Sequence, residues 1–388
     1  MTEKIEQWLA IGLMSGTSAD GIDAALVQTD GTTPPRLLAF ASHPYSSEIR
    51  QRVLTLQQPG PGEIDLLGEL DRDLGILFAQ AALVVCGTAH VAPEQVTVIG
   101  SHGQTVRHRP PHFSLQIGDP FRISALTGIT TVADFRPADL ARGGEGAPLV
   151  PLFHQCLFNR IGQRVAVVNL GGIANVTALP ALPGQTLISG DTGPANTLLD
   201  LLAARISNGA QQCDRDGRYA ARGRFDPQAL AWLMEHPYLH RPFPKSTGRE
   251  EFGPQLLDQF QQKFPLLSVE DCFATLTRFT AATVAMAARK LLDPFPQAVV
   301  LCGGGAHNPE LVRHLADFLP EASMQTSHSL GVDPDAMEAQ AFAWFAVRTL
   351  RGLPSSLPEA THATEAAILG SIHPGKKNVT TLPFLAHP

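Results

Sequence analysis

Four glycine-rich turns follow strand-like runs in this sequence, at 15–23, 170–174, 190–196 and 303–308. Backbone without side chains can bring several N–H groups onto one anion, and the N-terminus of a following helix adds a partial positive charge. A single glycine turn usually only reverses the chain. Four such turns at strand ends predict a polyphosphate site.

The first of these turns also carries polar side chains that suit a phosphate group. Ser15, Thr17 and Ser18 offer hydroxyl donors, and Asp20 and Asp23 offer carboxylates that would hold Mg²⁺ directly or through water. A plain hairpin turn, in which the same side chains satisfy local backbone groups, is the alternative. We favour the functional interpretation and assign no other residue as a metal ligand.

Asp191 stands in an Asp-Thr-Gly triplet at the end of a strand-like run, just before an expected helix. That triplet carries the catalytic aspartate of aspartic proteases, which need two carboxylates that share a proton. The sequence holds one Asp-Thr-Gly and no Asp-Ser-Gly, so we exclude this class. Asp191 either faces a cleft as a functional carboxylate or caps the following helix.

Other familiar motifs are incomplete. The Lys-Ser-Thr triplet at 245–247 follows prolines rather than the glycine loop of a P-loop protein, and no glycine turn has the full dinucleotide-binding pattern in its context. His102, His108 and His112 lack zinc-binding spacing, but His102, in a turn of small residues, is suited to hydrogen-bond a ligand. Glu338 lies among apolar residues and faces either solvent or a site.

Composition excludes several partners. The chain of 388 residues has 29 Lys and Arg against 36 Asp and Glu, a net charge of −7, which argues against nucleic acid. It contains no apolar run long enough to span a bilayer and no signal peptide. Its five cysteines are scattered without a Cys-x-x-Cys pair, as in reduced proteins. We therefore expect a cytoplasmic protein without a nucleic-acid or membrane partner.

Apolar runs and turn signals predict strands at 8–14, 22–27, 37–42, 95–100, 113–117, 129–134, 164–169, 175–179 and 298–302. The run at 95–100 is expected to end in a turn at 101–104. Helical spacing and capping signals predict helices at 46–58, 64–86, 197–206, from Pro309 after an Asn308 cap, and from an Asp333 cap to about 352.

Strands that alternate with helices predict an α/β protein of two lobes. Each half opens with a strand, a glycine turn and a second strand. We expect a first lobe of residues 1–135 plus 340–375, a second lobe of residues 136–339, and a loosely ordered tail at 376–388.

The motifs in their order resemble the anhydro-N-acetylmuramic acid kinase family. The stretches that carry the resemblance are 14–23, 101–105, 134–136, 169–175, 190–196, 301–305 and 337–339. The resemblance runs from about Ile11 to Gly370, nearly the whole chain. It implies the two-lobed sugar kinase, actin and heat-shock chaperone-like fold, a duplicated ribonuclease H-like α/β fold with a central cleft.

The resemblance further implies that the chain converts 1,6-anhydro-N-acetylmuramic acid, water and ATP into N-acetylmuramic acid 6-phosphate and ADP, with Mg²⁺. Asp191 would be the catalytic base, and the substrate a small amino sugar. Sugar contacts are expected from His102, Gln104, Asp134, Arg136 and Glu338. ATP contacts are expected from Gly16, Thr17, Ser18, Ala19, Asp20, Gly21, Ile22, Asp23, Gly171, Gly172, Asn175, Gly303, Gly304, Gly305 and Asn308.

Several alternatives stay open on the sequence. A kinase of the same fold acting on another sugar would use Asp191 to deprotonate a free hydroxyl. A non-enzymatic ATP-binding module would show no sugar-stimulated turnover, and a glycoside hydrolase using Asp191 and Glu338 would need no ATP. A homodimer is also left open.

Overall fold

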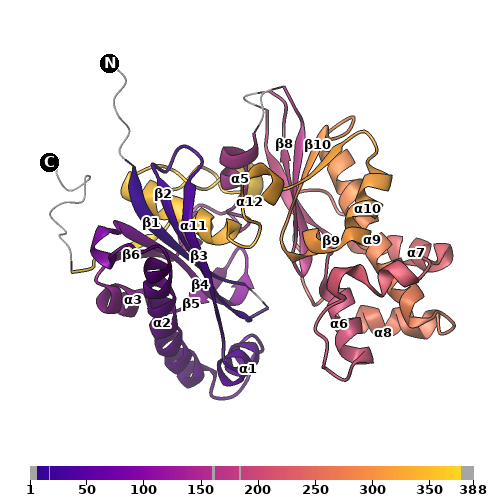
Figure 1. Ribbon diagram of the computed structural model, residues 1–388, viewed down its shortest axis with the longest axis horizontal. Coiled ribbons are helices and arrows are strands. Elements are labelled where there is room, and N and C mark those ends of the chain that lie inside the picture. The colour runs from indigo at the N-terminus through magenta and orange to yellow at the C-terminus, as the bar shows by residue number, and fades with distance from the viewer. Residues whose placement is uncertain (1–6, 17, 160–161, 183–184, 377–388) are drawn as a thin grey trace. The chain divides into compact units, whose positions relative to one another are not determined.

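The computed structural model describes residues 7–16, 18–159, 162–182 and 185–376. The chain divides into two compact units (Figure 1). Unit 1 contains the chain up to Leu157 and again from Ala336, and unit 2 contains Phe158–Asp335. The first break therefore lies after Leu157 rather than at the expected residue 135. The segment between belongs to unit 1 because Arg136 donates to His102 and the Phe153 ring packs 5.6 Å from that of Trp344. Apart from residue 376, the expected tail lies outside the described residues.

In the described part of unit 1, seven strands form one sheet in the order β12-β6-β4-β1-β2-β3, with β5 paired to β4. β1, β2 and β3 are antiparallel neighbours, whereas β4 runs parallel to β1 and β6 runs parallel to β4. The strands are β1 (Trp8–Ser15), β2 (Gly21–Thr29), β3 (Arg36–Pro44), β4 (Val98–Arg109), β5 (Phe113–Ile117), β6 (Thr130–Ala133) and β12 (Ser371–His373).

The helices of unit 1 come from both ends of the chain. They are α1 (Ser47–Leu56), α2 (Glu63–Thr88), α3 (Pro120–Thr127), α4 (Pro137–Leu140), α5 (Pro151–Phe158), α11 (Met337–Leu350) and α12 (Pro358–Thr361). Within the described chain, no helix is long and apolar enough to cross a membrane.

Helices α2 and α11 cover opposite faces of this sheet (Figure 1). Ile11 and Leu13 of β1 belong to the hydrophobic core that includes α2, so Gly12 between them faces the other way. Gly12 and Gly100 are paired neighbours on β1 and β4. A Cβ on Gly12 would overlap the carbonyl of Ala339, and one on Gly100 would overlap that of Phe342. These two glycines let α11 pack directly on the sheet backbone.

The described part of unit 2 contains a five-stranded sheet in the order β11-β10-β7-β8-β9. β7, β8 and β9 are antiparallel, and β10 and β11 continue in parallel from β7. The strands are β7 (Val165–Leu170), β8 (Ile173–Leu179), β9 (Ile188–Pro194), β10 (Ala298–Cys302) and β11 (Ser323–Thr326). The helices are α6 (Thr197–Ile206), α7 (Pro227–Met234), α8 (Pro254–Lys263), α9 (Val269–Leu291) and α10 (Pro309–Phe318).

The two sheets share one plan. The order β9-β8-β7-β10-β11 repeats β3-β2-β1-β4-β6, with the same parallel and antiparallel pairs. Each unit opens with a strand, a glycine turn and a strand, as the sequence predicts. The α/β class and its duplication are confirmed.

Three local expectations are wrong. The 101–104 segment continues β4, and 190–194 lies within β9, although both were expected to be turns. Sheet pairing holds these residues extended in spite of their glycines. The last helix begins at Met337 after an Ala336 cap, because Asp333 closes a local turn by accepting from the N–H of Asp335 at 3.0 Å.

We predict that Gly100→Ala lowers the free energy of unfolding of unit 1 by about 1–3 kcal/mol, because α11 must move away from the sheet. Urea denaturation followed by circular dichroism measures the change. Gly87→Ala is the matched control: this α2 glycine has open space around its Cβ position and should gain about 0.5–1 kcal/mol. Equal stability of Gly100→Ala and wild type would contradict the close packing.

Candidate active site

Asp191 is fixed by four hydrogen bonds on β9. Its Oδ1 accepts from Asn175 Nδ2 at 3.1 Å, and its Oδ2 accepts from the backbone N–H of Thr247 at 2.9 Å. Its own N–H donates to the Lys245 carbonyl at 2.8 Å, and its carbonyl accepts from the Tyr238 hydroxyl at 2.8 Å. Both the backbone and the carboxylate are therefore held in one orientation. The alternative of a helix cap is wrong, because α6 begins after Asn196.

The surroundings of Asp191 tune its basicity. Burial raises the pKa of the carboxyl from 3.8 to about 6, although the Thr247 N–H and the Asn175 amide lower it. The charge of Glu250 adds to the rise, and that of Lys245 opposes it. A carboxylate with this pKa is ionised at neutral pH and still basic enough to take a proton. Asp191 is partly exposed to solvent, so it does not lie in a sealed core.

Three of the four predicted glycine turns meet within unit 2. The turn after β7 and the turn after β10 start side by side, since Asn169 and Cys302 are paired in the sheet. Asn196 joins the third, because its Nδ2 donates to the carbonyls of Leu170 at 3.0 Å and Gly171 at 2.8 Å. Asn175, predicted to contact ATP, instead donates to Asp191.

A cavity of about 260 Å³ opens beside these turns. Asn196, Gly304 and Asn308 line it together with the acidic segment 213–216. Its volume is below the usual range for pockets that enclose a whole drug-sized ligand. The cavity therefore suits one part of a nucleotide. Two of its lining residues, Gly304 and Asn308, were predicted from the sequence to contact ATP.

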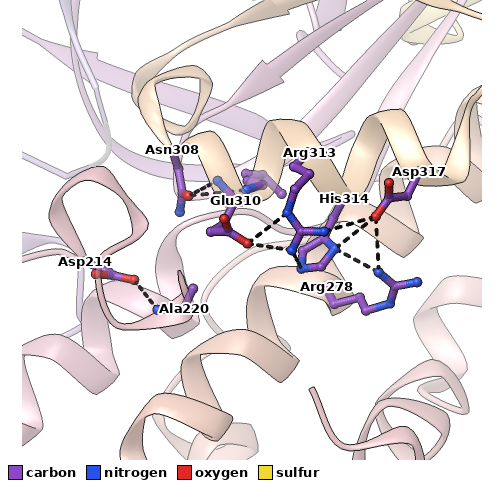
Figure 2. A network of polar contacts seen from close by, with 9 residues as sticks. Asp214, Ala220, Arg278, Asn308, Glu310, Arg313, His314 and Asp317 are labelled. Carbon is purple, nitrogen blue, oxygen red and sulfur yellow. Dashed lines mark hydrogen bonds and ion pairs between the residues drawn. The ribbon is translucent and has the colours of Figure 1, made fainter. Parts of the chain in front are cut away.

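Asn308 is the N-cap of α10, as predicted. Its Oδ1 accepts from the backbone N–H groups of Glu310 at 3.1 Å and Leu311 at 3.2 Å. Figure 2 shows the charged network along this helix, in which Arg313 contacts Glu310 at 2.6 Å and Asp317 at 3.3 Å, and Arg278 of α9 lies 3.7 Å from Asp317. The network ties α10 to α9, and Asn308 at the start of α10 lines the cavity.

The first glycine turn lies in unit 1, and buried polar side chains hold it in place. The Ser15 hydroxyl lies 2.7 Å from both the Gly21 carbonyl and Gln104 Oε1, and Tyr45 donates to it at 3.0 Å. Gln104 Nε2 donates to the Gly16 carbonyl at 3.0 Å and to the Thr105 carbonyl at 3.2 Å. Gln104 is fully buried, and both hydrogens of its amide have acceptors, so it shapes this turn.

Residues of this turn differ in what they can offer. Ser18 and Asp20 are exposed, whereas Ala19 and Ile22 are buried in the core. Asp20 pairs with Arg50 at 3.3 Å. Asp23 accepts from the Ser42 hydroxyl at 2.6 Å. Ala19 and Ile22 can therefore contact a ligand only through their backbones, and Thr17 lies outside the described residues. The described chain contains no cluster of three His, Cys, Asp or Glu residues that would hold a metal by itself.

His102, Arg136 and Glu338 come together in unit 1. Arg136 Nη2 donates to His102 Nε2 at 2.9 Å, while His102 Nδ1 donates to the Gly103 carbonyl at 2.9 Å. Burial and the Arg136 charge lower the pKa of His102 to about 3, which keeps the imidazole neutral. Burial also lowers the pKa of Arg136 to about 10, against the opposing charge of Glu338. A cation held in this way is suited to bind a carboxylate.

Asp134 does not join this group. Its Oδ2 accepts from the Ser371 hydroxyl of β12 at 2.9 Å. The predicted site residues do not include Tyr238 and Thr247, which contact Asp191 from 47 and 56 positions further along the chain. The only sequence signal in this region is the Lys-Ser-Thr triplet at 245–247, which lacks the glycine loop of a P-loop protein.

Comparisons with known proteins agree with the resemblance. A family model described as anhydro-N-acetylmuramic acid kinase matches residues 8–375. A protein of that name from Shewanella amazonensis is 45% identical over 373 residues, which cover 95% of this chain and 100% of the relative. Another of that name, from Shewanella oneidensis, is 45% identical over 363 residues, covering 93% of this chain and 97% of the relative.

We predict a pH-dependent gain in stability for Asp191→Asn. Because the pKa in the folded protein, about 6, lies above the ordinary value of 3.8, the folded state binds this proton more tightly than the unfolded chain does. Wild-type stability therefore falls as the pH rises from about 4 to about 6 and stays lower above it. Urea denaturation should show Asp191→Asn about 1–2 kcal/mol more stable, relative to wild type, at pH 8 than at pH 4. The same difference at both pH values would exclude a raised pKa.

Proposed function

This chain belongs to the anhydro-N-acetylmuramic acid kinase family, and we propose that Asp191 is the general base of its reaction. The chain is a kinase that opens the 1,6-anhydro ring of 1,6-anhydro-N-acetylmuramic acid and phosphorylates O6. The products are N-acetylmuramic acid 6-phosphate and ADP. The reaction therefore joins a hydrolysis and a phosphoryl transfer.

The chemistry explains why one base serves both parts. In the anhydro sugar, O6 is bonded to C1, so no hydroxyl is free at that position. Asp191 takes a proton from water as the water oxygen attacks C1. The C1–O6 bond breaks with its electron pair on O6, and O6 then bonds to the γ-phosphorus as the bond to ADP breaks. The phosphoryl group thus takes the place of the proton that a general acid gives in ordinary glycosidases. Attack opposite O6 inverts C1.

One observation carries this proposal: the Asp191 carboxylate is held in one orientation on β9 and the residue is still partly exposed to solvent, while burial raises its pKa to about 6. Its two oxygens each accept one hydrogen bond, from Asn175 and Thr247, which leaves lone pairs for a water proton. A fully exposed aspartate would be less basic. A carboxylate sealed in the core would be out of reach of water.

For the sugar, we propose contacts with His102, Arg136 and Glu338. The lactyl carboxylate of the muramic acid suits the buried Arg136 guanidinium, which also donates to His102 Nε2 and the Gly146 carbonyl. Glu338 is suited to accept from a sugar hydroxyl. Gln104, which supports the first glycine turn, and Asp134, which accepts from Ser371, are the other two residues that the resemblance implies for the sugar.

For ATP, we propose that the glycine turns bind the phosphates and that the 260 Å³ cavity holds the nucleoside end. Asp20, exposed in the first turn, and Asp23 are the carboxylates that would hold Mg²⁺, with water and phosphate oxygens completing its shell. Two carboxylates fit this ion, which is rarely held by an all-protein cage. When bound, Mg²⁺ neutralises charge on the phosphoryl oxygens.

We predict that Asp191→Asn lowers kcat by about 10²–10⁴-fold, because general base catalysis contributes that much. Coupled ADP release with 1,6-anhydro-N-acetylmuramic acid measures the rate, and isothermal titration should show ATP affinity within a few-fold of wild type. Full activity of the variant would remove Asp191 from this role. ADP release with sugars that have a free 6-hydroxyl, and none with the anhydro sugar, would indicate a different substrate.

We also predict the origin of the anomeric oxygen. Product formed in ¹⁸O-labelled water should carry one label on the oxygen at C1 and none in the phosphate, because water attacks C1 and O6 stays on the sugar. Mass spectrometry of the product and its fragments, taken before the anomeric oxygen exchanges with solvent, measures this. Label in the phosphate group would contradict O6 as the phosphoryl acceptor.

A further inference from the structure

A short segment, 243–247, runs along the outer side of β9 and forms what we call the strap. The N–H of Asp191 donates to the Lys245 carbonyl at 2.8 Å, and the N–H of Thr247 donates to Asp191 Oδ2 at 2.9 Å. Next to Asp191, a Cβ on Gly190 would lie 2.8 Å from Phe243 Cδ1 and 3.0 Å from the Lys245 carbonyl oxygen. The strap therefore contacts the strand closely on both sides of this hydrogen bond.

Lys245 fastens the strap to the preceding turn. Its side chain is only 9% exposed, and Nζ donates to the carbonyls of Tyr238 and Leu239, each at 3.0 Å. The ammonium also lies 4.4 Å from the centre of the Tyr238 ring and 4.9 Å from that of Phe243. Lys245 forms no ion pair with any residue that the structure describes. A buried ammonium group usually has a carboxylate partner. The hydrogen bonds from Lys245 to two backbone carbonyls therefore need a functional explanation.

The contacts of Lys245 lead to Asp191 along two routes. One follows the backbone from Lys245 to the Thr247 N–H on the carboxylate. The other passes through Tyr238, whose carbonyl receives the ammonium and whose hydroxyl donates to the Asp191 carbonyl at 2.8 Å. Lys245 therefore links the turn to the strap, and each of these two segments donates a hydrogen bond to Asp191.

We propose that Lys245 is a positioning residue, which holds the strap against β9 so that the Thr247 N–H stays on the Asp191 carboxylate. This inference rests on the proposed role of Asp191 as the base. Lys245 itself does not touch the carboxylate or the reacting atoms. Its role is to keep one donor in place and thereby fix the orientation and basicity of the base.

Other charges near this cluster set what a variant changes. Glu250 raises the pKa of Asp191, and Lys245 lowers it through its charge. Burial lowers the pKa of Lys245 to about 8, and the positive charges of Lys290 and Arg241 act in the same direction. The negative charges of Glu251 and Asp191 oppose this shift. Lys290, at the end of α9, is exposed and makes no described contact with the strap. Lys290→Met therefore removes a positive charge that acts on Lys245 and leaves the hydrogen bonds of Lys245 to the preceding turn in place.

The test is the pH profile of kcat/KM in Lys245→Met, which keeps the length of the side chain and removes its donors and charge. In wild type, kcat/KM should fall as the pH drops through about 6. Without the Thr247 hydrogen bond, we expect this acid limb to move up by about one pH unit. The loss should then be about fivefold at pH 6 and negligible above pH 8. Lys290→Met should leave the acid limb within a few tenths of a unit.

A second variant covers the case in which Lys245→Met does not fold. Gly190→Ala pushes the strap away from the other side and leaves Lys245 intact, so it should raise the acid limb in the same direction. An acid limb that stays at the wild-type pH in folded Lys245→Met or in Gly190→Ala overturns the inference. If Asp191→Asn is inactive in that case, Asp191 keeps its role and only the positioning role of Lys245 fails. If Asp191→Asn is active, the proposed base fails as well.

Discussion

The Asp191 carboxylate has to be desolvated enough to be basic and hydrogen-bonded enough to stay ionised. Burial drives its pKa up, and each donor on its oxygens drives it down, so the value near neutrality is a balance of opposing effects. Asn175 supplies one donor from the neighbouring strand, and Thr247 supplies the other from a segment that reaches β9 from outside the sheet. The Thr247 donor is a backbone N–H, so its position depends on the contacts that hold its segment against β9.

Elsewhere in the structure, hydrogen bonds also hold glycine turns and polar side chains in place. In unit 1, Ser15 and Gln104 support the glycine turn after β1 from inside the core, so the turn is shaped before any ligand arrives. In unit 2, Asn196 ties the turn after β7 to the start of α6. Arg136 donates to the neutral His102, and the charge of Glu338 favours its protonated form. Each of these residues is set by hydrogen bonds between segments distant in the chain.

The sequence predicts elements and motifs well and contacts poorly. Strand patterns and the Asn308 cap are local signals, and the structure confirms them. The turns expected at 101–104 and in 190–194 are strands, because the sheet overrides the preference of their glycines. Gln104 reads as a polar residue suited to a sugar, but burial commits both ends of its amide. Lys245 and Thr247 carry no periodic or motif signal, since their partner lies more than fifty residues away in the chain.

The division of unit 1 between two stretches of chain has a consequence for synthesis on the ribosome. β1 and β4 are made early, but α11, which packs on Gly12 and Gly100, is made only after all of unit 2. At a synthesis rate of about 5–20 residues per second, this delay is on the order of ten seconds or more. During that time the continuous unit 2 can complete its own core, while the sheet of the first-made unit leaves one apolar face uncovered. Unit 1 is therefore begun first on the ribosome but completes its fold after unit 2.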